Sequence, residues 1–297
     1  MQDTSWIDRV AYPFESHHFE IDGARMHYVD EGHGAPIVML HGTPTWSFLY
    51  RNMIKSLAPH YRCIVPDHLG FGLSDKPEHV GYYPRDHARR LQALIEHLGL
   101  RNLTLVVHDF GGPIGLSYAI AQPDNVHAIV LFNTWLWSLQ GELIPEAAGL
   151  LGRGPVGTFL FEQLNYEVHV VFRSVWGDRS KLTRKLHQQY LKPFPQPRDR
   201  QSVRILAREL RASSAWYDEL WAQRERIKDI PALLLWGDKD LLFKTKHLAR
   251  WQSLFTNAET VRFPESGHFV QEEVPDKLKP IVEQFLEQQK LDRYSVP

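Results

Sequence analysis

The chain has 297 residues, enough for one large domain or two small ones at roughly 100–200 residues per domain. Lys and Arg total 34 and Asp and Glu total 35, so the net charge is −1 and the basic excess typical of nucleic-acid and anionic-membrane binders is absent. Because Cys63 is the only cysteine, an intramolecular disulfide and a cysteine-rich zinc site are excluded. The absence of a signal-peptide pattern and of any run of ~18 apolar residues predicts a cytoplasmic protein without a membrane span.

Short apolar segments alternate with helical patterns over the first half of the chain. Asp22-Gly23 is a hairpin signal between two short strands, and later apolar runs predict buried strands. The expected strands are residues 18–21, 25–29, 37–40, 62–66, 103–107 and 128–132, and the expected helices are 46–57, 85–98 and 114–121.

The same alternation resumes near the C-terminus, after a long interruption. Strands are expected at 232–236 and 259–263 and helices at 246–255 and 276–289, which together predict an α/β fold with a mostly parallel sheet and helices on both faces. The interrupting segment, 134–226, is rich in aromatic residues and helical in pattern, without a strand-like run. An insertion at the carboxyl edge of a sheet covers the crevice where such folds bind ligands. We therefore expect a core domain at 1–133 and 227–297 and a helical cap domain at 134–226, inserted after the sixth strand.

The strand at 103–107 runs directly into Asp109, two glycines and a helix. A nucleophile elbow is such a strained turn from a strand into a helix, with small residues that let the backbones approach each other. Serine is the usual central residue, whereas this turn has Asp109. A carboxylate at a helix N-terminus is stabilised in its ionised form and can attack carbon to form an ester. On this segment alone, Asp109 could equally be a helix cap.

Two further polar segments follow the strands at 232–236 and 259–263. Asp238 and Asp240 follow the first strand, and either could orient a base; His268 lies in the loop after the second. Nucleophile, acid and histidine occur in this order in α/β-hydrolase sites, each after a strand of the sheet. The three positions together favour a catalytic site over a helix cap and a solvated histidine.

The chain resembles α/β-hydrolases of the haloalkane dehalogenase and epoxide hydrolase branch. Four segments carry the resemblance, which covers 20–132 and 228–290 but extends to the cap only in position and character. They are His41-Gly42-Thr43-Pro44 with the residues that follow to 51, the segment 66–77, His108-Asp109-Phe110-Gly111-Gly112, and the segment 267–272. The first segment is closer to haloalkane dehalogenases than to most epoxide hydrolases. The resemblance implies the α/β-hydrolase fold and a haloalkane dehalogenase-like activity.

The resemblance also implies the roles of the site residues. Asp109 would be the nucleophile, and His268 would activate the water that hydrolyses the alkyl-aspartyl ester. In this family the orienting acid follows the sixth or the seventh strand, and here the sixth ends in Asn133 and Thr134, without a carboxylate. The Gly-x-x-Asp spacing after the seventh strand then selects Asp240 over Asp238. No cofactor is expected, because the chain lacks a zinc-type His-Glu-x-x-His and a Gly-x-Gly-x-x-Gly phosphate loop.

The expected leaving-group site departs from the family pattern. Backbone N–H groups of Thr43 and Phe110 would form the oxyanion hole, but dehalogenases carry at the Phe110 position a tryptophan whose indole holds the halide. The side chain of Phe110 has no hydrogen-bond donor, and the side chain of Thr43 offers one hydroxyl. Losing a charge-assisted hydrogen bond costs roughly 1.5–3 kcal/mol. Trp135 or Trp137 could replace the missing donor, although packing within an aromatic cap explains both equally well.

Three alternatives stay open. Epoxide hydrolysis would use the same nucleophile and histidine, with proton donors among the cap residues Tyr166, Tyr190 and Tyr217. A related subgroup decarboxylates β-lactones during olefin formation, and the segment 61–68 is similar to it; that role implies a long hydrophobic channel and partner enzymes. A ligand-binding receptor on a hydrolase scaffold is the alternative without an enzyme activity. In the leading interpretation the partners are a small apolar substrate and water, and the chain acts as a monomer or a homodimer.

Overall fold

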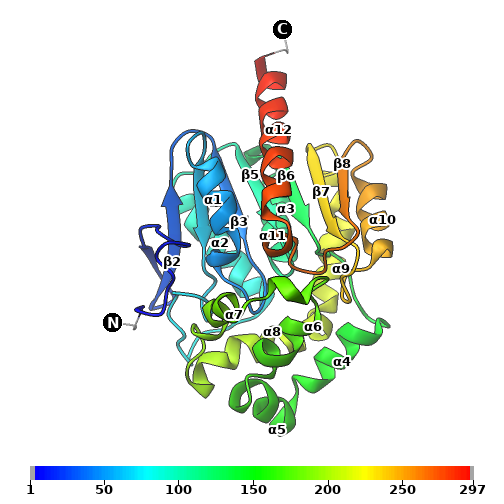
Figure 1. Cartoon of the computed structure of the whole chain (residues 1–297). Coiled ribbons are helices and arrows are strands. Elements are labelled where there is room, and N and C mark those ends of the chain that lie inside the picture. Colours follow the sequence, from blue (N-terminus) through cyan, green and yellow to red (C-terminus); the bar gives the residue numbers. More distant parts are fainter. Residues whose placement is uncertain (1–3, 295–297) are drawn as a thin grey trace.

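The computed structural model describes residues 4–294, with side chains to residue 289. Eight strands of this described part form one central sheet in the order β1-β2-β4-β3-β5-β6-β7-β8 (Figure 1). Strand β2 is antiparallel to β1 and β4, and the other neighbouring strands are parallel. The strands are β1 His17–Ile21, β2 Ala24–Glu31, β3 Pro36–Leu40, β4 Arg62–Pro66, β5 Leu103–Val107, β6 Val126–Phe132, β7 Ala232–Gly237 and β8 Glu259–Phe263. The expected α/β fold with a mostly parallel sheet is confirmed.

The central strands are buried along their length because helices cover the sheet. Every residue of β5 and β7 is buried, as expected of continuous apolar runs in a parallel sheet. Helix α1 packs against α12, and α2 packs against α3. The helices outside the insertion are α1 Arg51–Leu57, α2 Pro84–His97, α3 Gly111–Ala121, α10 Thr245–Leu254, α11 Val270–Glu273 and α12 Pro275–Tyr294. The helix expected at 46–57 is divided, since a buried 3₁₀ turn, η1 (Ser47–Tyr50), precedes α1.

A helical insertion follows β6, as the sequence predicts. Figure 1 shows its helices gathered beyond one end of the sheet, at the bottom of the view. They are α4 Leu143–Leu151, α5 Gly154–Gly157, α6 Phe172–Ser174, α7 Arg184–Leu191, α8 Gln201–Ala212 and α9 Ser214–Ala222, with π-helical turns η3 Thr158–Gln163 and η4 Glu167–Val171. Helix α4 packs against α8. None of the helices within residues 4–294 combines the length and apolar character needed to cross a membrane.

Candidate active site

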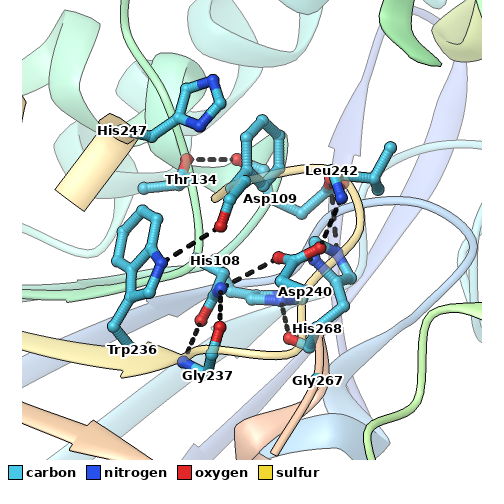
Figure 2. Close-up of polar contacts among 12 residues, drawn as sticks. His108, Asp109, Thr134, Trp236, Gly237, Asp240, Leu242, His247, Gly267 and His268 are labelled. Carbon is cyan, nitrogen blue, oxygen red and sulfur yellow. Dashed lines mark hydrogen bonds and ion pairs between the residues drawn. The ribbon is translucent and has the colours of Figure 1, made fainter. Parts of the chain in front are cut away.

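The turn between β5 and α3 holds Asp109 in a strained conformation. Its φ is 51°, in the left-handed region that non-glycine residues rarely occupy. The backbone N–H of Asp109 donates to the carbonyl of Asn133 (3.1 Å), and the hydroxyl of Thr134 donates to the carbonyl of Asp109 (2.6 Å; Figure 2). A Cβ at Gly111 would lie 2.2 Å from the carbonyl oxygen of Leu40, so this turn requires glycine there. These contacts fix the carboxyl group at the carboxyl edge of the sheet.

Backbone N–H groups hold the Asp109 carboxylate. Oδ1 accepts the N–H of Thr43 at 2.9 Å, and the N–H of Phe110 also donates to this carboxylate. Burial opposes ionisation of Asp109, but hydrogen bonding and charge from His268, with a smaller contribution from His108, lower its pKa below the usual value. Asp109 is therefore ionised at neutral pH.

His268 lies between two carboxylates. Its Nδ1 is 2.8 Å from Oδ2 of Asp240, and its Nε2 is 3.6 Å from Oδ2 of Asp109 (Figure 2). Burial alone would lower the pKa of His268, but the charges of Asp240 and Asp109 outweigh it and raise the pKa to about 10. In the resting site the imidazole is consequently protonated, with one N–H directed at each carboxylate.

The turn after β7 places Asp240, and not Asp238, beside the histidine. Asp240 Oδ2 also accepts the amide of Asn133 (2.9 Å), and Oδ1 accepts the N–H of Leu242 (2.7 Å). Asp238 forms an ion pair with Arg262 at 3.0 Å. The carboxylate of Asp240 is thus fully buried with three donors around it, which suits it to orient an imidazole.

A cavity of about 210 Å³ opens onto this site. Asp109, Phe110, Thr43 and His268 line one side, and apolar side chains of the insertion line much of the rest, among them Ile144, Ala147 and Leu151 from α4 and Ala207 and Leu210 from α8. This volume is below the ~300–1,000 Å³ typical of pockets for drug-sized ligands. The cavity suits a small, largely apolar molecule.

Several side chains considered as donors from the sequence do not line this cavity. Trp135 packs edge-on against Phe110, with ring centroids 4.8 Å apart, and Trp137 packs against Trp221 at 4.9 Å. The hydroxyls of two tyrosines of the insertion are bonded elsewhere: Tyr190 to Glu272 and Tyr217 to the carbonyl of Glu209. Of the candidate donors, Thr43 and Tyr166 line the cavity. The Thr43 hydroxyl is buried without a hydrogen-bond partner among the described residues.

Three residues of the site were missed by sequence reasoning. Asn133 bridges β6 and β7, since it accepts the N–H of Gly237 (2.8 Å) as well as donating to Asp240. His108 donates from Nε2 to the carbonyl of His268 (2.9 Å); burial lowers its pKa to about 3, so it stays neutral. Glu167 lines the cavity from η4. Val171, at the other end of this π-helical turn, also lines the cavity, but a single turn is too short for the sequence to show which of its residues are buried.

Among residues 4–294 no group of three or more His, Cys, Asp or Glu side chains is arranged to hold a metal ion. The free thiol of Cys63 is buried, and burial raises its pKa to about 12.

Comparison with known proteins supports the resemblance. The alpha/beta hydrolase fold family matches residues 35–275. Haloalkane dehalogenase 2 of Mycobacterium tuberculosis is 34% identical over 281 residues, covering 94% of this chain and 97% of that protein. Cis-3-alkyl-4-alkyloxetan-2-one decarboxylase of Shewanella oneidensis is 32% identical over 283 residues, covering 92% and 89%. Among solved structures, haloalkane dehalogenase DatA from Agrobacterium tumefaciens has a TM-score of 0.83 at 29% identity, covering 93% of this chain and 97% of that one.

Proposed function

The chain belongs to the α/β-hydrolase family, and within it we propose a haloalkane dehalogenase-like hydrolase that uses Asp109 as a covalent nucleophile on a small apolar substrate. The observation that carries this proposal is the carboxylate at the elbow. Oδ1 of Asp109 is held by the N–H of Thr43, while Oδ2 lies 3.6 Å from Nε2 of His268 at the cavity. A held, ionised carboxylate needs no base before it attacks carbon. We also propose that residues 134–226 act as a cap domain over this cavity.

In the first half-reaction, Oδ2 of Asp109 forms a bond to the substrate carbon and the carbon–halogen bond breaks, with its electron pair leaving on the halide. The product on the enzyme is a neutral alkyl ester. Its formation removes one of the two negative charges that raise the pKa of His268. The imidazole can then lose its proton from Nε2 and becomes available as a base.

In the second half-reaction, His268 takes a proton from water, and the resulting hydroxide attacks the carbonyl carbon of the ester. Negative charge develops on Oδ1, which already accepts the N–H of Thr43, and the N–H of Phe110 donates to the same carboxylate. Asp240 stabilises the imidazolium that forms and keeps Nδ1 protonated. Release of the alcohol restores the carboxylate.

A second candidate is opening of a strained oxygen ring, as in an epoxide or a β-lactone. The observation that favours it is the lack of an indole donor at the leaving-group end, where Phe110 lines the cavity and Trp135 and Trp137 do not. The similarity to an oxetanone decarboxylase also supports it. The small cavity favours short substrates over long-chain lactones. A receptor would differ from both enzymes by retaining its ligand unchanged.

Isotope labelling tests the covalent step. After a single turnover of 1-bromobutane in ¹⁸O-water, we expect one ¹⁸O atom in the Asp109 carboxylate and none in the butanol, because water attacks the ester carbonyl. Peptide mass spectrometry locates the label, and Asp109→Asn is the control that should take up none. Label found in the butanol after that single turnover would mean that water attacks the substrate directly.

A further inference from the structure

Glu167 is an acidic side chain in the apolar wall of the cavity. It is the first residue of η4, two residues after Asn165, which adopts a φ of 49°. Glu167 lines the same cavity as Asp109 and His268, and it is 9% exposed. The insertion thereby places a carboxyl group in the cavity that the nucleophile also lines.

No hydrogen bond or ion pair joins the Glu167 side chain to any other residue of the described chain, in contrast to Glu162, which is paired with Arg204. Burying an unpaired carboxylate in an apolar wall is costly, so such a group binds a proton instead. Burial, with a further contribution from the negative charge of Asp109, raises the pKa of Glu167 to about 8. Glu167 therefore faces the cavity as a neutral acid with an O–H to donate.

We infer that Glu167 is the proton donor to the leaving group and enables the site to open strained cyclic ethers as well as carbon–halogen bonds. This inference rests on the proposed function, because it requires attack by Asp109. Glu167 takes the role that the tyrosines of the insertion would have in an epoxide hydrolase. Of these, Tyr190 and Tyr217 have their hydroxyls bonded elsewhere, and Tyr166 lines the cavity beside Glu167.

The proton balance of ring opening is complete with the groups present. Oδ2 of Asp109 bonds to a ring carbon, the ring carbon–oxygen bond breaks with its electron pair on oxygen, and this oxygen takes the proton of Glu167. A hydroxyalkyl ester and a Glu167 carboxylate result. Hydrolysis of the ester by water then yields the diol, the Asp109 carboxylate and one proton, which returns to Glu167. The sum is epoxide plus water to diol.

The test compares two four-carbon substrates in a His268→Gln background, where the ester on Asp109 accumulates. We measure the rate of ester formation by intact-protein mass spectrometry with 1,2-epoxybutane and with 1-bromobutane. Replacing Glu167 by Gln keeps the shape and a hydrogen-bond donor but removes the acidic proton. We expect the epoxide reaction to slow about 100-fold, as for loss of a general acid, and the bromobutane reaction to stay within about threefold. Glu219→Gln, at an exposed cap position, should change neither rate.

The pH dependence gives a second readout. The titratable groups that line the cavity with Glu167 are Asp109, His268 and Tyr166. Raising the pH through about 8 ionises Glu167, so the epoxide reaction should slow while the bromobutane reaction does not. Loss of the positive His268 in the test background moves this midpoint upward. In the Glu167→Gln variant the pH dependence should disappear.

The outcomes distinguish a failure of the Glu167 proton-donor role from a failure of the covalent mechanism on Asp109. Equal slowing of both substrates, no slowing of the epoxide reaction, or an ester from bromobutane but none from the epoxide in the parent background overturns the role of Glu167. Absence of an ester from both substrates while Glu167 is intact overturns the covalent function itself.

Discussion

The His268→Gln variant is expected to stop halfway through the reaction, with the substrate carbon attached to Asp109. In the variant the Asp109 carboxylate loses the hydrogen bond and charge of His268 but keeps the N–H donors of Thr43 and Phe110. Because the ordinary pKa of an aspartate lies far below 7, the carboxylate stays ionised without help from a base. Alkylation should proceed in the variant. Hydrolysis of the ester needs a base that takes a proton from water. His268 is the base in position, because its Nε2 lies 3.6 Å from Oδ2 of Asp109. Turnover should fall to background after one equivalent of halide has been released.

Intact-protein mass spectrometry measures this directly. With excess 1-bromobutane the variant should gain one butyl group without bromine, and with an epoxide it should gain the whole substrate mass. A double variant with Asp109→Asn is the matched control and should gain nothing. If the His268→Gln protein stays unmodified by a substrate that the parent converts, the two-step mechanism is wrong.

Sequence pattern was sufficient for the sheet because its central strands are buried on both faces. The apolar runs of β5 and β7 are continuous, a pattern typical of buried strands, and the bounds of both strands follow the expected segments closely. The ends of β5, β7 and β8 also indicated where the candidate site lies, since parallel strands present their carboxyl ends at one edge. That rule brings Asp109, Asp240 and His268 to the same edge without fixing their distances.

The details that pattern could not supply depend on turn geometry and on packing in the helical insertion. The residues alone left Asp238 and Asp240 open, because the direction of each carboxylate is set by the turn after β7. Aromatic residues that line a site cannot be distinguished in the sequence from those that pack against each other. The contact of Trp137 with Trp221 therefore could not be predicted. Glu167 lies in a short π-helical turn. A single turn is too short for the periodicity of the sequence to show that an acidic residue is buried there.

Replacing Asp240 by Asn is expected to lower turnover by about 10⁴-fold, as removal of the orienting acid does in other triads. The Asp240 carboxylate accepts the proton of His268 Nδ1 at 2.8 Å. An amide at this position can donate to Nδ1 instead, which leaves the proton on Nε2, the nitrogen that must accept one from water. Ester formation on Asp109 should survive, so the variant should accumulate the ester during turnover.

The role of Asp240 as a positioning residue has its own readout. Removing the charge of Asp240 should lower the pKa of His268 below its value of about 10, because the Coulombic contribution of Asp240 is the main one that raises it. Titration of the imidazole by NMR in Asp240→Asn checks this shift, which a merely destabilised protein would not show. Asp238→Asn is the matched control two residues away: Asp238 pairs with Arg262, so turnover should stay within about threefold. A larger loss of turnover in Asp238→Asn than in Asp240→Asn would assign the orienting acid to Asp238.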